Sequence, residues 1–149
     1  MSGRLAPTTT PDTKFFWEAL KEERLLIQRC SGCDVLRHPP RPMCPHCRSL
    51  EWKAVESQGR GTVHSFVMPR HPPLPWFEGT YVVALVDLEE GVRVISNLCD
   101  VAPEEIEIGM PVELFFQHFD GGVSLHQFRP TKASGSSARR EDADRRTKA

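Results

Sequence analysis

The sequence predicts a small, mainly β protein that carries a four-cysteine metal ribbon. Three observations support this fold class. The chain holds 13 prolines and 10 glycines in 149 residues, which favours short strands and turns over a helical bundle. Four of its five cysteines form two close pairs. Beyond residue 51, short apolar segments of strand-like pattern alternate with turn residues.

The composition limits the kinds of protein that this chain can form. Hydrophobic residues make up 39% and charged residues 26%, enough for a modest core. The length suits one ordinary domain, or a small domain with a smaller module, and excludes a multidomain enzyme. No apolar run approaches the ~20 residues of a membrane span, and the first residues lack an apolar signal core. We therefore expect a soluble, cytoplasmic protein.

The chain divides into four predicted parts: an N-terminal arm and helix (1–23), a zinc ribbon (24–51), an OB-type barrel (52–130) and a disordered tail (131–149). The tail contains no aromatic or large aliphatic residue, and its six basic and three acidic residues give it a charge of +3. Because the whole chain carries −1, residues 1–130 carry −4, which is the wrong sign for a nucleic-acid-binding domain.

The predicted helix spans residues 12–23. Thr10-Pro11 provides a cap and a proline at the first turn, and Phe16 and Leu20 recur at helical spacing. Neighbouring side chains on a helix diverge by about 100°, so the three adjacent aromatics Phe15, Phe16 and Trp17 cannot share one face. Part of this aromatic surface needs a second contact, within the chain or on a partner.

The cysteine pairs predict a metal site. Cys30-Ser31-Gly32-Cys33 and Cys44-Pro45-His46-Cys47 each place two thiolates on one tight turn, and two such turns form a tetrahedral S4 cage. Zn²⁺ is the expected ion, and iron in a rubredoxin-like site is the alternative. Four sulfur ligands leave no position for water, so the metal has a structural role. A redox dithiol fits less well, because the strand–helix alternation of thioredoxin-like proteins is missing from the sequence.

The remaining strands predict a Greek-key barrel of the OB type. Two hairpins, 81–98 and 112–128, turn at Glu89-Glu90-Gly91 and Asp120-Gly121-Gly122. A longer connection, 101–109, joins them, as expected for five or six short strands in this topology. The strand candidates are 52–55, 62–68, 81–88, 92–98, 112–119 and 123–128.

A proline-rich segment, residues 69–77, joins the first two of the longer strands. It is extended and poor in amide donors, yet it carries the large apolar residues Leu74, Trp76 and Phe77, which suits a binding loop as well as a rigid spacer. Together with Phe15, Phe16 and Trp17, these side chains form the predicted partner-binding surface.

The sequence offers no catalytic residue. The motifs of serine hydrolases, phosphate-binding loops and zinc proteases are missing, and the histidines are scattered. His64, His118 and His126 lie in predicted strands, where a structural role is expected, and Cys99 suits a small buried side chain. A basic cluster in the ribbon suits either a solvated surface or an acidic partner; it comprises Arg29, Arg37, His38, Arg41 and Arg48.

Five segments together resemble a known family. They are 16–20 (FWEAL), 25–30 (LLIQRC), 39–47 (PPRPMCPHC), 59–66 (GRGTVHSF) and 108–112 (IGMPV). In this order they are similar to the acyl-CoA-associated proteins that join a rubredoxin-like zinc ribbon to an OB-fold. The similarity covers about residues 12–130.

This resemblance implies an accessory subunit without catalytic residues of its own. Members of this family resemble one another in binding thiolase-like, lipid-transfer-protein-like aldolases. These aldolases act on CoA thioesters, including those of steroid side-chain degradation. Some are fused to or accompany an enoyl-CoA hydratase. The expected partners are therefore a thiolase-like enzyme, a CoA thioester bound at the shared complex and a separate hydratase, with no membrane and no nucleic acid. The competing hypothesis is a nucleic-acid-binding module, because OB barrels and zinc ribbons both serve that function.

Overall fold

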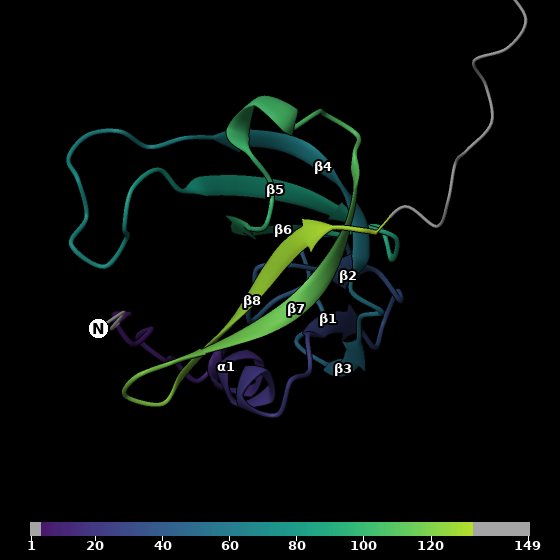
Figure 1. The fold of residues 1–149 in the computed structure, drawn as a ribbon. Coiled ribbons are helices and arrows are strands. Elements are labelled where there is room, and N and C mark those ends of the chain that lie inside the picture. The colour runs from purple at the N-terminus through teal and green to yellow at the C-terminus, as the bar shows by residue number, and fades with distance from the viewer. Residues whose placement is uncertain (1–3, 133–149) are drawn as a thin grey trace, which may run out of the picture.

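A helix, a three-stranded sheet and a closed barrel follow one another along the chain (Figure 1). The structure is a computed structural model that describes residues 4–132. The predicted tail therefore lies almost wholly outside the described residues. No helix among residues 4–132 is both long enough and apolar enough to cross a membrane.

Helix α1 (Lys14–Lys21) is shorter than the predicted 12–23. The carbonyl oxygen of Thr10 accepts the backbone N–H groups of Thr13 and Lys14 at 3.1 and 2.9 Å, and the Thr13 hydroxyl accepts the N–H of Thr10 at 2.9 Å. This turn occupies the predicted first helical residues, so the helix begins only after it. Glu23 ends the helix in the left-handed region, with φ of 56°.

The ribbon sheet has the order β2-β1-β3 and contains β1 (Leu26–Cys30), β2 (Leu36–Arg37) and β3 (Trp52–Glu56). All five residues of β3 pair with β1, from Leu26–Glu56 to Cys30–Trp52. The sequence placed Trp52–Val55 in the barrel, and this assignment was wrong. An isolated strand candidate carries no signal of which sheet it joins, because pairing depends on residues more than 20 positions away.

The closed barrel has the strand order β4-β5-β6-β8-β7 and confirms the predicted barrel topology and both hairpins. Its strands are β4 (Arg60–Val67), β5 (Val82–Leu88), β6 (Arg93–Leu98), β7 (Pro111–Phe119) and β8 (Val123–Pro130), and a short 3-10 helix, Pro103–Glu105, interrupts the connection between β6 and β7. A Cβ atom on Gly61 would lie 2.4 Å from the Asp87 carbonyl oxygen, so β4 and β5 require glycine at this crossing.

Side chains complete the seam where β6 meets β8. The two strands share one parallel pair, Leu98–Phe128. Beside it, the Ser96 hydroxyl donates to the His126 carbonyl at 2.7 Å, and His126 Nε2 donates to the Ile95 carbonyl at 3.0 Å. These side-chain donors satisfy backbone carbonyl groups that the hydrogen bonds of a longer β ladder would otherwise satisfy.

One continuous core joins helix, ribbon and barrel, and it includes the fully buried Leu20, Ile27, Val86, Val94 and Phe128. The helix, the ribbon and the barrel therefore share one hydrophobic core and are not independently packed domains.

The helical aromatics find most of their contacts inside the chain. Phe16 is 3% exposed, and its ring lies 5.3 Å from that of His38 and 5.4 Å from that of His126. Phe15 packs at 4.5 Å against Trp52 of the ribbon, and Trp17 packs edge-on against Phe16. The ribbon and the barrel thus enclose Phe16 almost completely, and its predicted contact with a partner stays a prediction. Phe15 and Trp17 stay half-buried.

Candidate metal centre and docking surface

The four ribbon cysteines converge on one point, with their Sγ atoms all within 4.8 Å of one another. Cys30 Sγ lies 3.5 Å from Cys47 Sγ, and Cys33 Sγ lies 3.7 Å from Cys44 Sγ. In a tetrahedral site with Zn–S bonds of about 2.3 Å, neighbouring sulfurs lie about 3.8 Å apart. The spacing of the sulfurs therefore fits a closed four-thiolate zinc site.

The local backbone favours a thiolate at Cys30. The N–H of Gly32 donates to Cys30 Sγ at 3.3 Å, and β1 ends at Cys30 so that the first knuckle turns directly out of the sheet. Burial opposes ionisation of Cys30, but the amides of Cys33 and Gly32 and the neighbouring thiols outweigh it and lower the pKa of Cys30 to about 6. A thiolate is the form that binds metal.

A buried polar network holds the chain between the two knuckles. Gln28, 1% exposed on β1, accepts hydrogen bonds through Oε1 from Arg37 Nε at 3.1 Å and from the backbone N–H of Arg41 at 2.8 Å. Arg37 Nη2 also donates to the Arg41 carbonyl at 3.2 Å. The network fixes residues 37–41, which lead into the second cysteine pair.

The predicted basic cluster is not a single surface. Arg37 is 6% exposed and belongs to this network, while Arg29 faces Asp34 at 3.6 Å. Burial, followed by the proximity of His126, lowers the pKa of His38 to about 4, so this ring is neutral. Arg41 and Arg48 remain exposed.

The three strand histidines have hydrogen-bond partners within the chain. His64 bonds to Asp87 at 2.9 Å, His118 bonds to Glu23 at 3.0 Å, and His126 bonds to the Ile95 carbonyl. Cys99 donates to Gln127 Oε1 at 2.7 Å, and burial, followed by the charge of Asp100, raises its pKa to about 11. The raised pKa keeps Cys99 as a protonated thiol at neutral pH rather than a nucleophilic thiolate.

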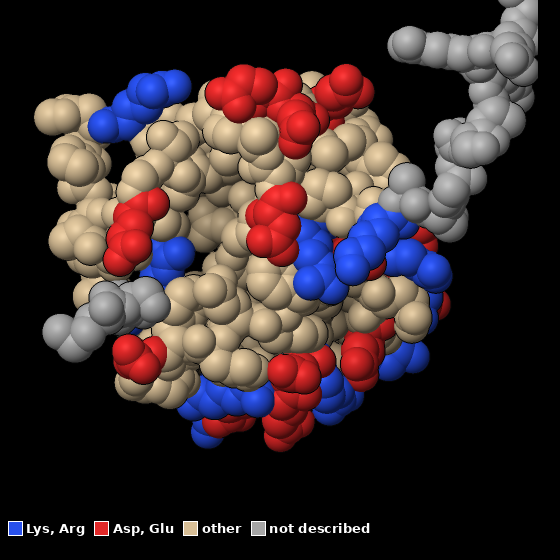
Figure 2. Space-filling view, viewed as in Figure 1, with Lys and Arg blue, Asp and Glu red and all other residues tan. Residues whose placement is uncertain are grey.

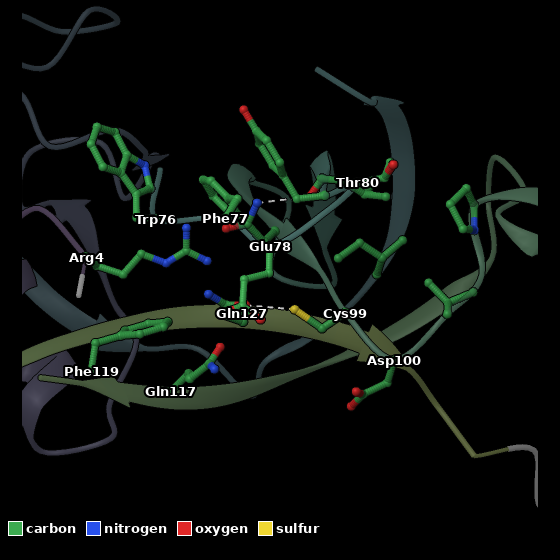
Figure 3. Close-up of a pocket in the computed structure, with 16 residues that line it drawn as sticks. Arg4, Trp76, Phe77, Glu78, Thr80, Cys99, Asp100, Gln117, Phe119 and Gln127 are labelled. Carbon is green, nitrogen blue, oxygen red and sulfur yellow. Dashed lines mark hydrogen bonds between the residues drawn. The ribbon is translucent and has the colours of Figure 1, made fainter. Parts of the chain in front are cut away.

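The proline-rich loop between β4 and β5 stands away from the barrel (Figure 1). Leu74, Trp76 and Phe77 are each half-buried. The Phe77 N–H donates to the Leu74 carbonyl at 3.1 Å, and the Phe77 ring stacks on Tyr81 with centroids 3.6 Å apart. These contacts preorganise the loop. They also make it one wall of a cavity of about 490 Å³ against the barrel (Figure 3).

A second, apolar groove of about 430 Å³ lies where helix, ribbon and barrel meet. Trp17, Pro39 and the 63%-exposed Ile95 are on its walls. Trp17 and the proline-rich loop thus lie at two separate hollows, and the partner-binding role of both stays a prediction.

Local sequence patterns give no sign of the buried role of Gln28 or of the cavity behind the loop. Gln28 is one of two polar residues in β1, next to Arg29, and nothing in the local pattern marks it as the fully buried one. The cavity is lined by Arg4, the loop, and residues near 100 and 119, which no local pattern connects.

A four-thiolate ribbon packed on a five-stranded OB-type barrel defines a class of two-module β proteins, and comparisons with known proteins identify the family. Residues 17–53 match the rubredoxin-like zinc ribbon domain of ChsH2, and residues 54–117 match the C-terminal OB-fold domain of ChsH2. The chain belongs to this ChsH2 (DUF35) family.

A solved structure titled Ltp2-ChsH2(DUF35) aldolase contains a similar chain, with a TM-score of 0.80 and 52% identity over 83% of this chain and 98% of that chain. A probable enoyl-CoA hydratase alpha subunit of Thermomonospora curvata is 51% identical over 127 residues, or 85% of this chain. The 3-oxo-4,17-pregnadiene-20-carboxyl-CoA hydratase alpha subunit of Mycobacterium tuberculosis is 40% identical over 126 residues, again 85% of this chain. The chain spans only 40% of the length of either hydratase subunit.

Proposed function

We propose that this chain is a non-catalytic accessory subunit that binds and supports a thiolase-superfamily acyl-CoA enzyme, a retro-aldol lyase of steroid side-chain degradation. The observation that carries the proposal is the similarity to the ChsH2(DUF35) chain of an aldolase, which extends over nearly all of that chain. The name of the Mycobacterium tuberculosis relative supports a steroid-derived CoA thioester as substrate.

The geometry of the described residues supports an indirect role. Cys99 is held as a neutral thiol, and the strand histidines are bonded to their own chain. The four clustered thiolates leave no open position on a bound ion. Bound zinc would stabilise the ribbon by on the order of 10 kcal/mol, which is a structural rather than a catalytic contribution.

Docking of this subunit would order the entrance of the partner's active site and exclude water from the bound thioester. In this proposal the proline-rich loop, with Trp76 and Phe77 on a preorganised backbone, makes the main contact. Preorganisation lowers the entropy cost of association, and aromatic anchors commonly contribute ~2 kcal/mol or more each.

The test is reconstitution with a thiolase-like enzyme of the same cells. We expect retro-aldol cleavage of a steroid side-chain CoA thioester only when both chains are present, and we expect them to co-elute. A separate enoyl-CoA hydratase is added in a further arm to determine whether it joins the same assembly. Steady turnover by the purified single chain, or full activity of the enzyme without it, would contradict the proposal.

A further inference from the structure

The cavity behind the proline-rich loop already contains a cationic side chain. Arg4 extends from the N-terminal arm into the cavity between Phe77 above and Phe119 below in the view of Figure 3. Its guanidinium carbon lies 3.6 Å from the centroid of Phe77 and 5.0 Å from that of Phe119. Two aromatic faces on one guanidinium are the arrangement that attracts arginine through cation–π interaction and stacking.

The charge and the hydrogen-bond donors of Arg4 are not fully satisfied in this position. No ion pair within residues 4–132 involves Arg4, and its Nε atom is buried without a hydrogen-bond partner. Burial lowers the pKa of Arg4, as expected for a cation that has lost water without gaining a carboxylate. A buried donor without an acceptor costs free energy, so a better-satisfied cation can displace Arg4 from between the two rings.

The rest of the cavity wall favours a cation. Apart from Arg4, its charged groups are the carboxylates of Glu78 and Asp100. Figure 2 shows the hollow between the loop, at the left of the view, and the barrel, with acidic and basic side chains at its rim. The cavity of about 490 Å³ has the size of a small-molecule site, so it accommodates an arginine together with its flanking main chain.

The floor of the cavity supplies a further polar group. Gln127 is 1% exposed, and its Oε1 accepts the thiol of Cys99, while its amide nitrogen points toward Arg4 in Figure 3. This buried amide is fixed by the thiol and is placed to donate to a main-chain carbonyl that enters with a peptide.

We propose that this cavity is a receptor for an arginine side chain of a protein partner, and that Arg4 of the chain itself occupies it until the partner binds. Guanidinium is favoured over a rounder ammonium because the planar group stacks between Phe77 and Phe119. Glu78 and Asp100, which line the cavity, are the carboxylates available to the incoming arginine. The inference stands independently of which enzyme the chain supports.

The experiment uses the full chain and two probes, N-acetyl-arginine amide and its uncharged isostere N-acetyl-citrulline amide, titrated by NMR. In the Arg4→Ala variant we expect saturable binding of the arginine probe, with shifts of the Trp76 indole signal, and about tenfold tighter than in the wild type because the competing side chain is gone. The citrulline probe should bind at least about tenfold more weakly. Adding Glu78→Gln to Arg4→Ala should weaken arginine binding severalfold.

Arg60→Ala is the matched control, because Arg60 is an exposed arginine outside the cavity that faces Glu89. It should leave probe binding unchanged. In the wild-type chain the Nε–H signal of Arg4 should shift as the arginine probe displaces it, which tests the proposal without a variant. Equal binding of the two probes, or no saturable binding of the arginine probe to a folded Arg4→Ala chain, would overturn the proposal and leave Arg4 as a fixed part of the wall.

Discussion

Replacing Gln28 by leucine should destabilise the chain strongly, although the two side chains have similar volumes. Gln28 Oε1 is the shared acceptor for the Arg37 guanidinium and the Arg41 N–H, and the side chain is 1% exposed. Arg37 Nη1 is already buried without a partner, and the Arg41 carbonyl is the other acceptor of the guanidinium. Leucine fills the space but removes the acceptor of the Arg41 N–H and the Oε1 partner of Arg37 Nε, which then retains only the Arg41 carbonyl at 3.3 Å.

The magnitude follows from these two losses. A hydrogen bond to a charged group contributes about 1.5–3 kcal/mol, and an orphaned buried donor costs about 1–3 kcal/mol. Allowing for the apolar area that leucine gains, we expect Gln28→Leu to lower the free energy of unfolding by roughly 3 kcal/mol. That is a large part of the 5–15 kcal/mol typical of a domain.

The assay is urea unfolding of the zinc-loaded, reduced protein at pH 7, followed by tryptophan fluorescence. Gln58→Leu, at an exposed position, is the matched control and should stay within about 0.5 kcal/mol of the wild type. In the double variant Gln28→Leu/Arg37→Leu the loss should fall short of the sum of the single losses by about 1.5–3 kcal/mol, because removing both partners leaves no unpaired charge. A Gln28→Leu chain within 1 kcal/mol of the wild type, or strictly additive losses, would refute the reasoning.

Three further predictions concern the metal, the loop and the buried histidine. Metal analysis should find one zinc per chain, lost in Cys44→Ser and retained in Cys99→Ser, because Cys99 lies outside the thiolate cluster; metal-free protein from a reduced preparation would contradict this. Trp76→Ala should weaken binding to the thiolase-like partner by roughly 2 kcal/mol with little change in the melting temperature of the free chain. The control Leu50→Ala, on the exposed ribbon surface, should change neither quantity. A large loss of stability with unchanged affinity would place Trp76 in the core. His38 has a pKa of about 4 in the fold against about 6.5 when unfolded, so the unfolded chain binds the extra proton and stability should fall as pH drops from about 6.5 towards 4. This slope should be smaller in His38→Asn than in the wild type at each pH, and equal slopes would show that the histidine is not held neutral.

Local patterns in the sequence determined the features whose contacts are close along the chain. The two cysteine pairs predict their knuckles because each pair spans only one turn, and the two hairpins follow from turn residues between adjacent strands. The clustered thiolates, the barrel and both hairpins were predictable for this reason.

Tertiary structure alone decided which surfaces are buried and which side chains meet. Phe16 is enclosed because the ribbon's His38 and the barrel's His126 reach it from two sides, and Trp52 joins the ribbon because β1 offers a free edge. Arg4 meets Phe77 and Phe119 across more than 70 residues of chain. Such contacts depend on how three modules close around one core, and no periodicity or spacing within a single segment encodes that closure.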